Sequence, residues 1–134
     1  VVIHEKRIEI RWADCDAYRH VNNAVYATYL EECRDEWLVA ALGSDADLWD
    51  YVLARVAIDF RRELTLVDDA VLVTAELVRI GNSSLTLREQ VRTLDGELAA
   101  ESEAVVVARD QTTGRSRLLN EQERAAFALA LASA

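Results

Sequence analysis

The sequence contains no proline and no methionine, and its only cysteines are Cys15 and Cys33. Two cysteines do not make a disulfide framework, so we expect reduced thiols and a cytoplasmic location. Because no initiator methionine is present, we expect the natural chain to start a few residues earlier. Residues 1–12 lack the basic and apolar parts of a secretory signal. No segment approaches the roughly 18 to 20 apolar residues that cross a bilayer, so we expect no membrane span.

Basic residues are also scarce, with 15 against 24 acidic residues and a formal net charge of −9. A protein that binds nucleic acid over its whole surface should be basic, so this class is disfavoured. The hydrophobic content of 51% and charged content of 29% are typical of a globular protein. A length of 134 residues without a repeat, low-complexity segment or linker predicts a single domain over 1–134.

The first third of the chain changes from strand to helical periodicity. Residues 2–13 alternate between apolar and polar positions, which predicts a half-buried strand. Residues 14–21 are polar and irregular, and we interpret them as a loop. Asn22 is the expected N-cap of a helix over 22–42, and Gly43 the expected residue after its last turn. Apolar residues at helical spacing form one wide stripe that predicts a core helix: Tyr26, Tyr29, Leu30, Cys33, Trp37 and Ala41.

The remainder is mostly strand. Alternating residues predict strands over 54–60, 70–80, 85–94 and 98–109, with a turn at 81–83 and a two-residue hairpin at Asp95–Gly96. Residues 120–132 are alanine-rich and weakly helical, with Asn120 as a possible cap. This order predicts an α+β domain in which the last four strands form a meander and the apolar helix packs against one antiparallel sheet.

Three common kinds of catalytic centre are disfavoured. The chain has no Gly-x-Ser-x-Gly motif, and its two histidines limit any serine triad. Cys15 lies between two aspartates, whose charges should raise the pKa of its thiol, and Cys33 belongs to the apolar stripe. Asp14, Asp16 and His20 are ligand types for a metal, but their spacing matches no zinc or calcium pattern.

The segment 14–23 concentrates polar chemistry directly before the long helix. It holds two carboxylates, a histidine and two carboxamides. The N-terminus of a helix has unpaired N–H groups and partial positive charge, which can stabilise a carboxylate or an oxyanion. The alternative is a capping loop that is polar only because loops are polar. The residues alone leave both interpretations open.

The same region resembles the hot-dog-fold acyl-CoA thioesterases, in the branch grouped with 4-hydroxybenzoyl-CoA thioesterase and the long-chain acyl-CoA thioesterases. The resemblance rests on residues 11–16 (RWADCD), 20–26 (HVNNAVY) and 29–34 (YLEECR). It implies five or six antiparallel strands wrapped around one long central helix. It also implies an enzyme that hydrolyses acyl-CoA to a free acid and coenzyme A, without a metal or another cofactor. A homodimer or homotetramer with active sites at the interface is expected.

The resemblance also implies roles for residues of the motif. The catalytic aspartate corresponds to Asp16, acting as a nucleophile or as a general base on water. The backbone N–H of Asn23 corresponds to the group that polarises the thioester carbonyl. His20 and Asn22 line the same pocket, although His20 could instead orient the loop, and Tyr26 is expected on the substrate side.

Further positions are implied less directly. Asp14 is expected to be structural, whereas Glu31 and Glu32 are the alternative carboxylates, because another hot-dog branch has its catalytic carboxylate on the helix. A turn resembling the family's Gly-x-x-Ser turn is expected to approach the substrate, or to be an ordinary hairpin: Gly81, Ser83 and Ser84. Four arginines are candidates for the phosphates of coenzyme A by location, although solvated strand edges explain them as well: Arg61, Arg62, Arg79 and Arg88.

Two other functions fit the same resemblance. One is a non-catalytic or acyl-carrier-protein-directed hot-dog protein that binds an acyl group. The other is a hot-dog dehydratase, although the spacing from Asp16 to His20 differs from the hydratase pattern. The sequence leaves open the acyl chain length and the choice between aromatic and aliphatic acyl groups.

Overall fold

The computed structural model describes residues 3–43 and 46–131. Short 3-10 turns at Trp12–Asp14, Leu48–Asp50 and Leu66–Asp68 connect its main elements. These elements are five strands and two helices, in the order β1 (Ile3–Glu9), α1 (Asn23–Leu42), β2 (Tyr51–Phe60), β3 (Ala70–Ile80), β4 (Ser84–Thr93), β5 (Leu98–Ala108) and α2 (Glu121–Ala130).

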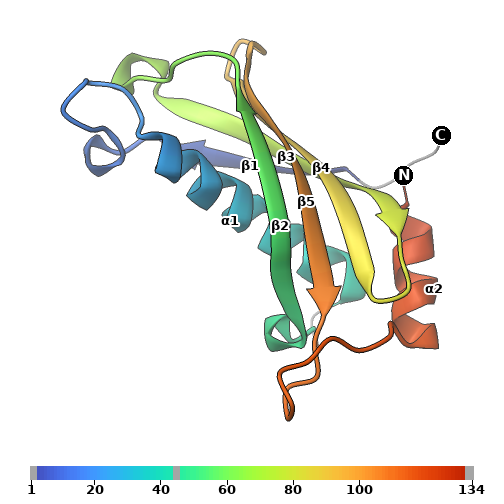
Figure 1. Ribbon diagram of the computed structural model, residues 1–134. Helices are drawn as coiled ribbons and strands as arrows, with labels where there is room; N and C mark the ends of the chain where they lie inside the picture. Colours follow the sequence, from blue (N-terminus) through green and yellow to red (C-terminus); the bar gives the residue numbers. More distant parts are fainter. Residues whose placement is uncertain (1–2, 44–45, 132–134) are drawn as a thin grey trace.

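The strands form one antiparallel sheet in the order β1-β3-β4-β5-β2 (Figure 1). The predicted meander of the last four strands is therefore wrong for β2, which pairs with β5 at the far edge instead of with β3. The reason is the connection through α1, which crosses the sheet between β1 and β2. Its 20 residues span about 30 Å, more than the roughly 19 Å between the outer strands of such a sheet.

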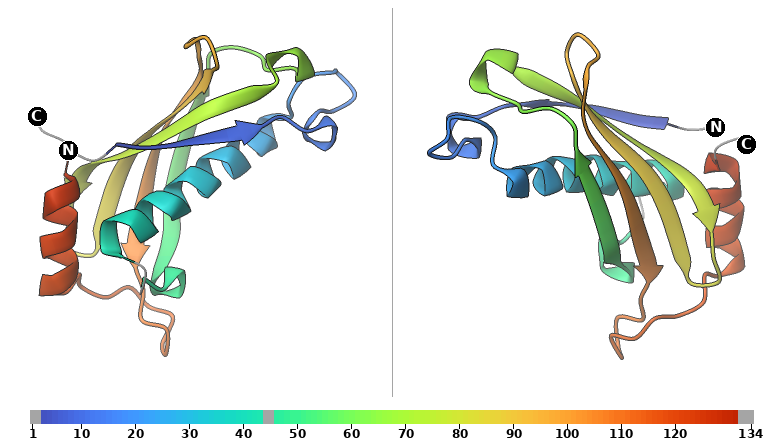
Figure 2. Two further views of the ribbon diagram at one scale, coloured as in Figure 1. Left: turned by 180° about the vertical axis from the view of Figure 1, so that it is seen from behind. Right: turned by 45° about the horizontal axis from the view of Figure 1, so that its top comes forward.

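α1 lies across one face of the sheet (Figure 2), and its predicted apolar stripe is part of the core between them. Tyr26, Tyr29, Leu30, Cys33 and Trp37 are all buried, as the sequence predicts, and Ala41 packs against them from the margin of the core. The sheet meets this stripe with alternate residues of β3 and β4: Val71, Val73, Ala75, Leu77, Leu85, Leu87 and Val91. Burial of this face explains why the helix forms although many of its residues are charged.

The ends of α1 are capped as predicted. The Asn22 side chain accepts the N–H of Ala24 at 2.8 Å. Gly43 has a φ of +99°, and its N–H donates to the carbonyl of Val39 at 2.8 Å. Glycine adopts such a φ without steric cost, so the sequence ends the helix at this point.

Two predicted strand boundaries differ from the structure by more than one residue. The first strand ends at Glu9 instead of residue 13, because the Asp14 carboxylate accepts the backbone N–H of Arg11 at 2.9 Å and turns the chain. The second strand begins at Tyr51 instead of residue 54. The predicted C-terminal helix is confirmed as α2, and its Phe127 ring stacks on Trp37 of α1 with centroids 6.0 Å apart.

Candidate active site

The polar segment before α1 folds into a small closed loop. Cys15 and Val21 form an isolated antiparallel bridge across its base. Inside it, the N–H of Asp16 donates to the His20 carbonyl at 3.1 Å, and the N–H of Arg19 donates to the Asp16 carbonyl at 3.0 Å. Arg19 has a φ of 68°, which the tight turn requires. The loop is therefore an ordered element that fixes Asp16.

The Asp16 carboxylate is held from both sides. Its Oδ1 accepts the N–H of Tyr18 at 2.9 Å, and its Oδ2 accepts the Nδ2–H of Asn22 at 3.3 Å. The Oδ1 of Asn22 in turn accepts the N–H of Ala24 in the first turn of α1. The Asn22 side chain thus connects the carboxylate to the helix N-terminus, while Asp16 stays half-buried in a cleft that also includes Trp12.

The first turn of α1 offers a backbone donor beside this carboxylate. Ala24 donates to the Asn22 side chain, and Val25 donates to the Asn22 carbonyl at 2.8 Å. Among the residues that the structure describes, no oxygen accepts the N–H of Asn23. This N–H lies at the positive end of the helix dipole, where it can bind a developing oxyanion.

Asp14 has the opposite environment. It is 2% exposed; one carboxylate oxygen accepts the Tyr29 hydroxyl at 2.7 Å, and the other accepts the Nη2–H of Arg11 at 2.9 Å. Burial alone would raise the pKa of this carboxyl, but Arg11 and Tyr29 together hold it below its usual value. Its backbone carbonyl accepts the N–H of Asn22 at 3.0 Å. Asp14 therefore ties the loop to the body of the domain.

A second cleft adjoins the N-terminus of α1. His20, Asn23 and Tyr26 line it together with the end of β2. The Tyr26 hydroxyl donates to the Arg62 carbonyl at 3.1 Å, and the Phe60 ring meets the Tyr26 ring edge-on at 5.1 Å. Arg61 and Arg62 belong to the same cleft. The structure thus brings together the following predicted residues: Asp16, His20, Asn22, Asn23, Tyr26, Arg61 and Arg62.

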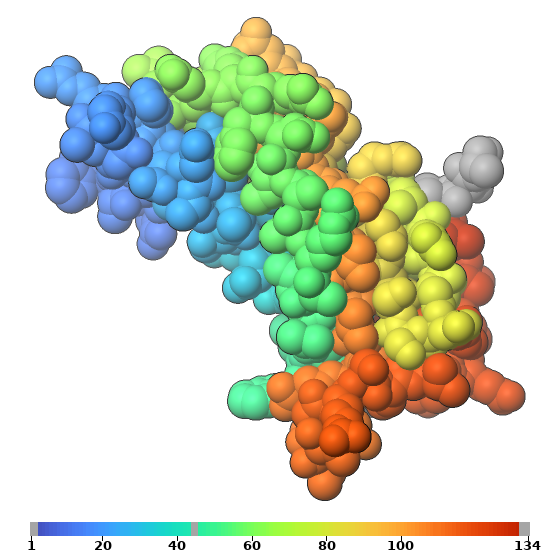
Figure 3. Space-filling view, viewed as in Figure 1, coloured from blue at the N-terminus to red at the C-terminus, as the bar shows by residue number. Residues whose placement is uncertain are grey.

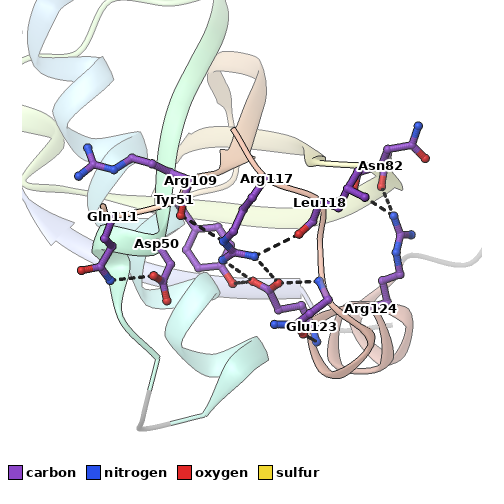
Figure 4. Close-up of polar contacts among 11 residues, drawn as sticks. Asp50, Tyr51, Asn82, Arg109, Gln111, Arg117, Leu118, Glu123 and Arg124 are labelled. Atoms are coloured by element: carbon purple, nitrogen blue, oxygen red, sulfur yellow. Dashed lines mark hydrogen bonds and ion pairs between the residues drawn. The ribbon is translucent and has the colours of Figure 1, made fainter. Parts of the chain in front are cut away.

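Other predicted binding residues lie elsewhere in the chain. The turn with Gly81, Ser83 and Ser84 lies beside α2, where the Arg124 guanidinium donates to the carbonyls of Gly81 and Asn82 at 3.0 and 3.1 Å (Figure 4). In Figure 1 this hairpin and the Asp16 loop are at opposite ends of the molecule. Arg79 is near the same end of β3. Arg88 pairs with Glu76 at 3.0 Å on the sheet face away from α1.

Metal and thiol chemistry find no support in the described chain. Over residues 3–43 and 46–131, no group of three or more His, Cys, Asp and Glu side chains is placed to hold a metal ion. Burial and the flanking Asp14 and Asp16 raise the pKa of the Cys15 thiol, and burial raises that of Cys33 to about 12.

Neither helix in this part of the chain is long and apolar enough to cross a membrane.

Comparison with protein families identifies the fold and the chemistry together. The model of the thioesterase-like superfamily matches residues 10–128, which include the loop, α1 and the whole sheet except β1. The chain belongs to the thioesterase-like superfamily. The predicted hot-dog fold and thioester hydrolase class are therefore confirmed.

Individual thioesterases agree with this assignment. The long-chain acyl-CoA thioesterase FadM of Escherichia coli (strain K12) is 30% identical over 128 residues, which cover 90% of this chain and 93% of FadM. A thioesterase from Thermus thermophilus, solved in complex with coenzyme A and Zn, is 31% identical with a TM-score of 0.84, covering 94% of this chain and 92% of that chain. A predicted thioesterase from Bacillus stearothermophilus shares the fold, with a TM-score of 0.88 at 23% identity and 99% coverage of both chains.

One feature of this thioesterase was missed from the sequence. Arg34 of α1 and Glu89 of β4 form a buried ion pair, in which the Arg34 Nε and Nη2 groups donate to the carboxylate at 2.7 and 2.9 Å. The available signal was positional: Arg34 follows Leu30 by one helical turn on the core side. Glu89 interrupts the buried alternation of Leu85, Leu87 and Val91. A charged residue at a core position indicates that it has a charged partner. The sequence alone does not show that Arg34 and Glu89 are partners of each other.

Proposed function

We propose that this thioesterase hydrolyses acyl-CoA thioesters to a free carboxylic acid and coenzyme A. The observation that carries the proposal is the Asp16 carboxylate fixed beside the free N–H of Asn23. The proposal is supported by FadM, a long-chain acyl-CoA thioesterase by name, and by the Thermus thermophilus thioesterase that was solved with coenzyme A.

The mechanism follows from the two groups that meet at the helix N-terminus. The N–H of Asn23 and the helix dipole bind the thioester oxygen and stabilise the charge that develops on it during attack. Asp16 either attacks the thioester carbonyl carbon with its own carboxylate oxygen or takes a proton from a water molecule that attacks this carbon. Both routes need a carboxylate oxygen held in a fixed position, and the N–H donors of Tyr18 and Asn22 orient the Asp16 carboxylate. The thiolate of coenzyme A is the leaving group.

Residues next to this pair face the incoming substrate. We propose that Asn22, His20 and Tyr26 line the entry, with Arg61 and Arg62 placed to meet phosphate groups. Both arginines are already held by carboxylates, Arg61 by Glu101 and Arg62 by Asp68 and Glu97. An arriving phosphate would therefore compete with these ion pairs in a protein whose net charge is −9.

We further propose a homodimer joined through β2. This strand is one of the two edges of the sheet and lies uncovered on the face seen in Figure 3. Apolar side chains follow its length, with Val52 47%, Val56 37% and Phe60 45% exposed. An open edge of this kind pairs readily with another strand, and a two-fold axis gives the antiparallel pairing of β2 with itself. Association of two such dimers would give the tetramer that the resemblance also allows.

This pairing has a consequence for the site. Antiparallel pairing puts the Phe60 end of one β2 beside the Tyr51 end of the other. Phe60 adjoins the Asn23 cleft of its own chain, and Tyr51 adjoins the 81–84 hairpin, since Tyr51 pairs with Ala108 and the Ala108 N–H donates to Ser83 at 2.8 Å. In the dimer the Gly81, Ser83 and Ser84 hairpin of one subunit therefore faces the Asp16 loop of the other. Arg79 lies on the same side.

A thiol-release assay with short, long and aromatic acyl-CoA substrates tests the proposed function. We expect release of coenzyme A from at least one class. An acyl-binding protein would bind these thioesters without turnover, and a dehydratase would remove water from a 3-hydroxyacyl thioester without releasing thiol.

Free thiols at Cys15 and Cys33 support the further proposal that the protein works in the cytoplasm.

A further inference from the structure

The cleft that holds Asp16 is lined mainly by apolar side chains. Its volume is about 510 Å³, within the range of roughly 300 to 1,000 Å³ that small-molecule sites occupy. The residues that line it with Asp16 are Trp12, Cys15, Ala17, Arg19 and Leu66. This space, the Trp12 cleft, therefore joins apolar surface directly to the carboxylate of the site.

The two largest apolar side chains of the cleft are open to a ligand. Trp12 is 82% exposed and Leu66 is 46% exposed. Within the described residues, the Trp12 ring makes no aromatic or cation–π contact. Arg19 is exposed as well, so its charged end can stay in water while its stem adds apolar surface. Exposed apolar surface that adjoins a site is typical of ligand binding.

Backbone hydrogen bonds fix the walls of the cleft relative to each other. Leu66 begins the 3-10 turn Leu66–Asp68, which lies beside the loop before α1 at one end of the molecule (Figure 1). At the end of this loop, the Val21 N–H donates to the Leu64 carbonyl at 2.7 Å. Ahead of the loop, the Ile10 N–H donates to the Asp69 carbonyl at 2.9 Å. The cleft is thus formed before a substrate binds, which lowers the cost of binding.

The thioester carbonyl carbon carries two groups, the acyl chain and the sulfur of coenzyme A. Asp16 lines the Trp12 cleft, whereas Asn23 lines the second cleft, and the two clefts share no lining residue. The second cleft holds a histidine, two arginines and a glutamate. The amides and phosphates of coenzyme A need hydrogen-bond partners and cations, whereas an acyl chain needs only apolar surface. The second cleft therefore suits coenzyme A, and the Trp12 cleft suits the acyl chain.

The size of the Trp12 cleft favours a long acyl chain. A cavity of about 150 Å³ takes benzene, which has six carbons, and the volume here is about 510 Å³. We propose that the Trp12 cleft binds the acyl chain of the substrate and that the enzyme prefers straight chains of about eight carbons or more over short ones. This inference rests on the proposed function.

The test compares kcat/KM of the intact protein for butanoyl-CoA and octanoyl-CoA. Full burial of one methylene is worth about fourfold in rate, and an open cleft covers each methylene on one side only. Over four methylenes we therefore expect octanoyl-CoA to be preferred by about tenfold. In Trp12→Ala this preference should fall to within about threefold of unity, whereas Trp12→Phe should keep part of it. Because Trp12 is 82% exposed, neither variant should impair folding.

Trp49→Ala is the matched control. Trp49 is 69% exposed and is not part of the cleft, so this variant should keep the preference of the wild type. Leu66→Trp narrows the cleft at another position and should lower kcat/KM for octanoyl-CoA more than for butanoyl-CoA. Equal kcat/KM for both substrates in the wild type, or an equal loss for both in Trp12→Ala, would overturn this inference and leave the proposed function intact. No hydrolysis of any acyl-CoA would overturn both.

Discussion

Asp14 and Asp16 are two residues apart and have opposite surroundings. Asp14 is buried and bound on both oxygens by Arg11 and Tyr29, whereas Asp16 is half-buried and faces a cleft. Because Asp14 is only 2% exposed, a substrate cannot reach its carboxylate. Asp14 is therefore a positioning residue, which holds the loop through its carbonyl bond to Asn22.

We expect Asp14→Asn to lower the free energy of unfolding by about 2 kcal/mol at pH 7, because charge-assisted hydrogen bonds to Arg11 are lost. The pKa of Asp14 lies below its usual value in the folded protein. Its stabilising contribution is therefore complete above the unfolded pKa of about 3.9 and is lost as the pH falls through the lower folded value. Urea unfolding at neutral and acidic pH measures this directly. The gap between wild type and variant should close in acid, and a gap of constant size would contradict this account.

The residues of the site differ in how far the sequence could predict them. Asp16, Asn22 and Asn23 belong to one contiguous motif at a helix N-terminus, so local rules were enough to place them together. The bond from Tyr29 to Asp14 joins residues 15 apart, and Arg34 and Glu89 are 55 apart. Such pairs depend on how α1 lies on the sheet, which periodicity does not specify.

At the scale of elements, the same limit applies to the strands. The 3.6-residue period of α1 predicted which side faces the core, because burial decides it. The partner of β2 could not be predicted in this way, since pairing with β5 depends on the path of α1 across the sheet. Local turn signals correctly joined β3 to β4 and β4 to β5.

The short helix α2 is held in place by a small charged cluster. Glu123 accepts hydrogen bonds from Arg117, Tyr51 and the backbone N–H of Asn120. Burial would raise the pKa of the Glu123 carboxyl, but Arg117 and Tyr51 lower it. Since Tyr51 starts β2, the cluster connects the C-terminal helix to the strand at the proposed interface.

We expect Glu123→Gln to lower the free energy of unfolding by about 2 kcal/mol, because Arg117 loses its charged partner in a partly buried setting. Glu121→Gln is the matched control on the same helix. Glu121 is exposed, so its replacement should change stability by less than about 0.5 kcal/mol. Chemical denaturation measures both variants, and equal effects would show that Glu123 is only a surface residue in solution.

At the scale of the whole molecule, one chain does not complete the proposed site. The Phe60 end of β2 adjoins the Asn23 cleft, whereas its Tyr51 end lies near the 81–84 hairpin at the opposite end of the same chain. Two copies joined at this edge would supply both parts.

Light scattering should therefore give a wild-type mass of at least about 30 kDa, twice the 15.0 kDa of one chain. Val56→Lys puts a charge in the middle of β2, next to Arg55, and should shift the mass toward one chain with a parallel loss of activity. Gln90→Lys, in the centre of the sheet on the face away from α1, is the control and should keep the wild-type mass. An active wild-type monomer would refute the shared site.

The central claim is that Asp16 drives the attack on a thioester held by the N–H of Asn23. The most direct measurement is kcat of Asp16→Asn with the best acyl-CoA substrate of the wild type. This variant keeps the shape of the side chain and removes its charge. Losing a positioned group of this kind costs at least about 10²-fold in rate, and we expect that fall in kcat with little change in KM or stability. Glu32→Gln, on the exposed side of α1, is the control and should stay within about twofold of wild type. An Asp16→Asn enzyme that turns over within a few-fold of wild type would contradict the account; the result for Glu32→Gln would then show whether Glu32 or Glu31 is the next candidate carboxylate.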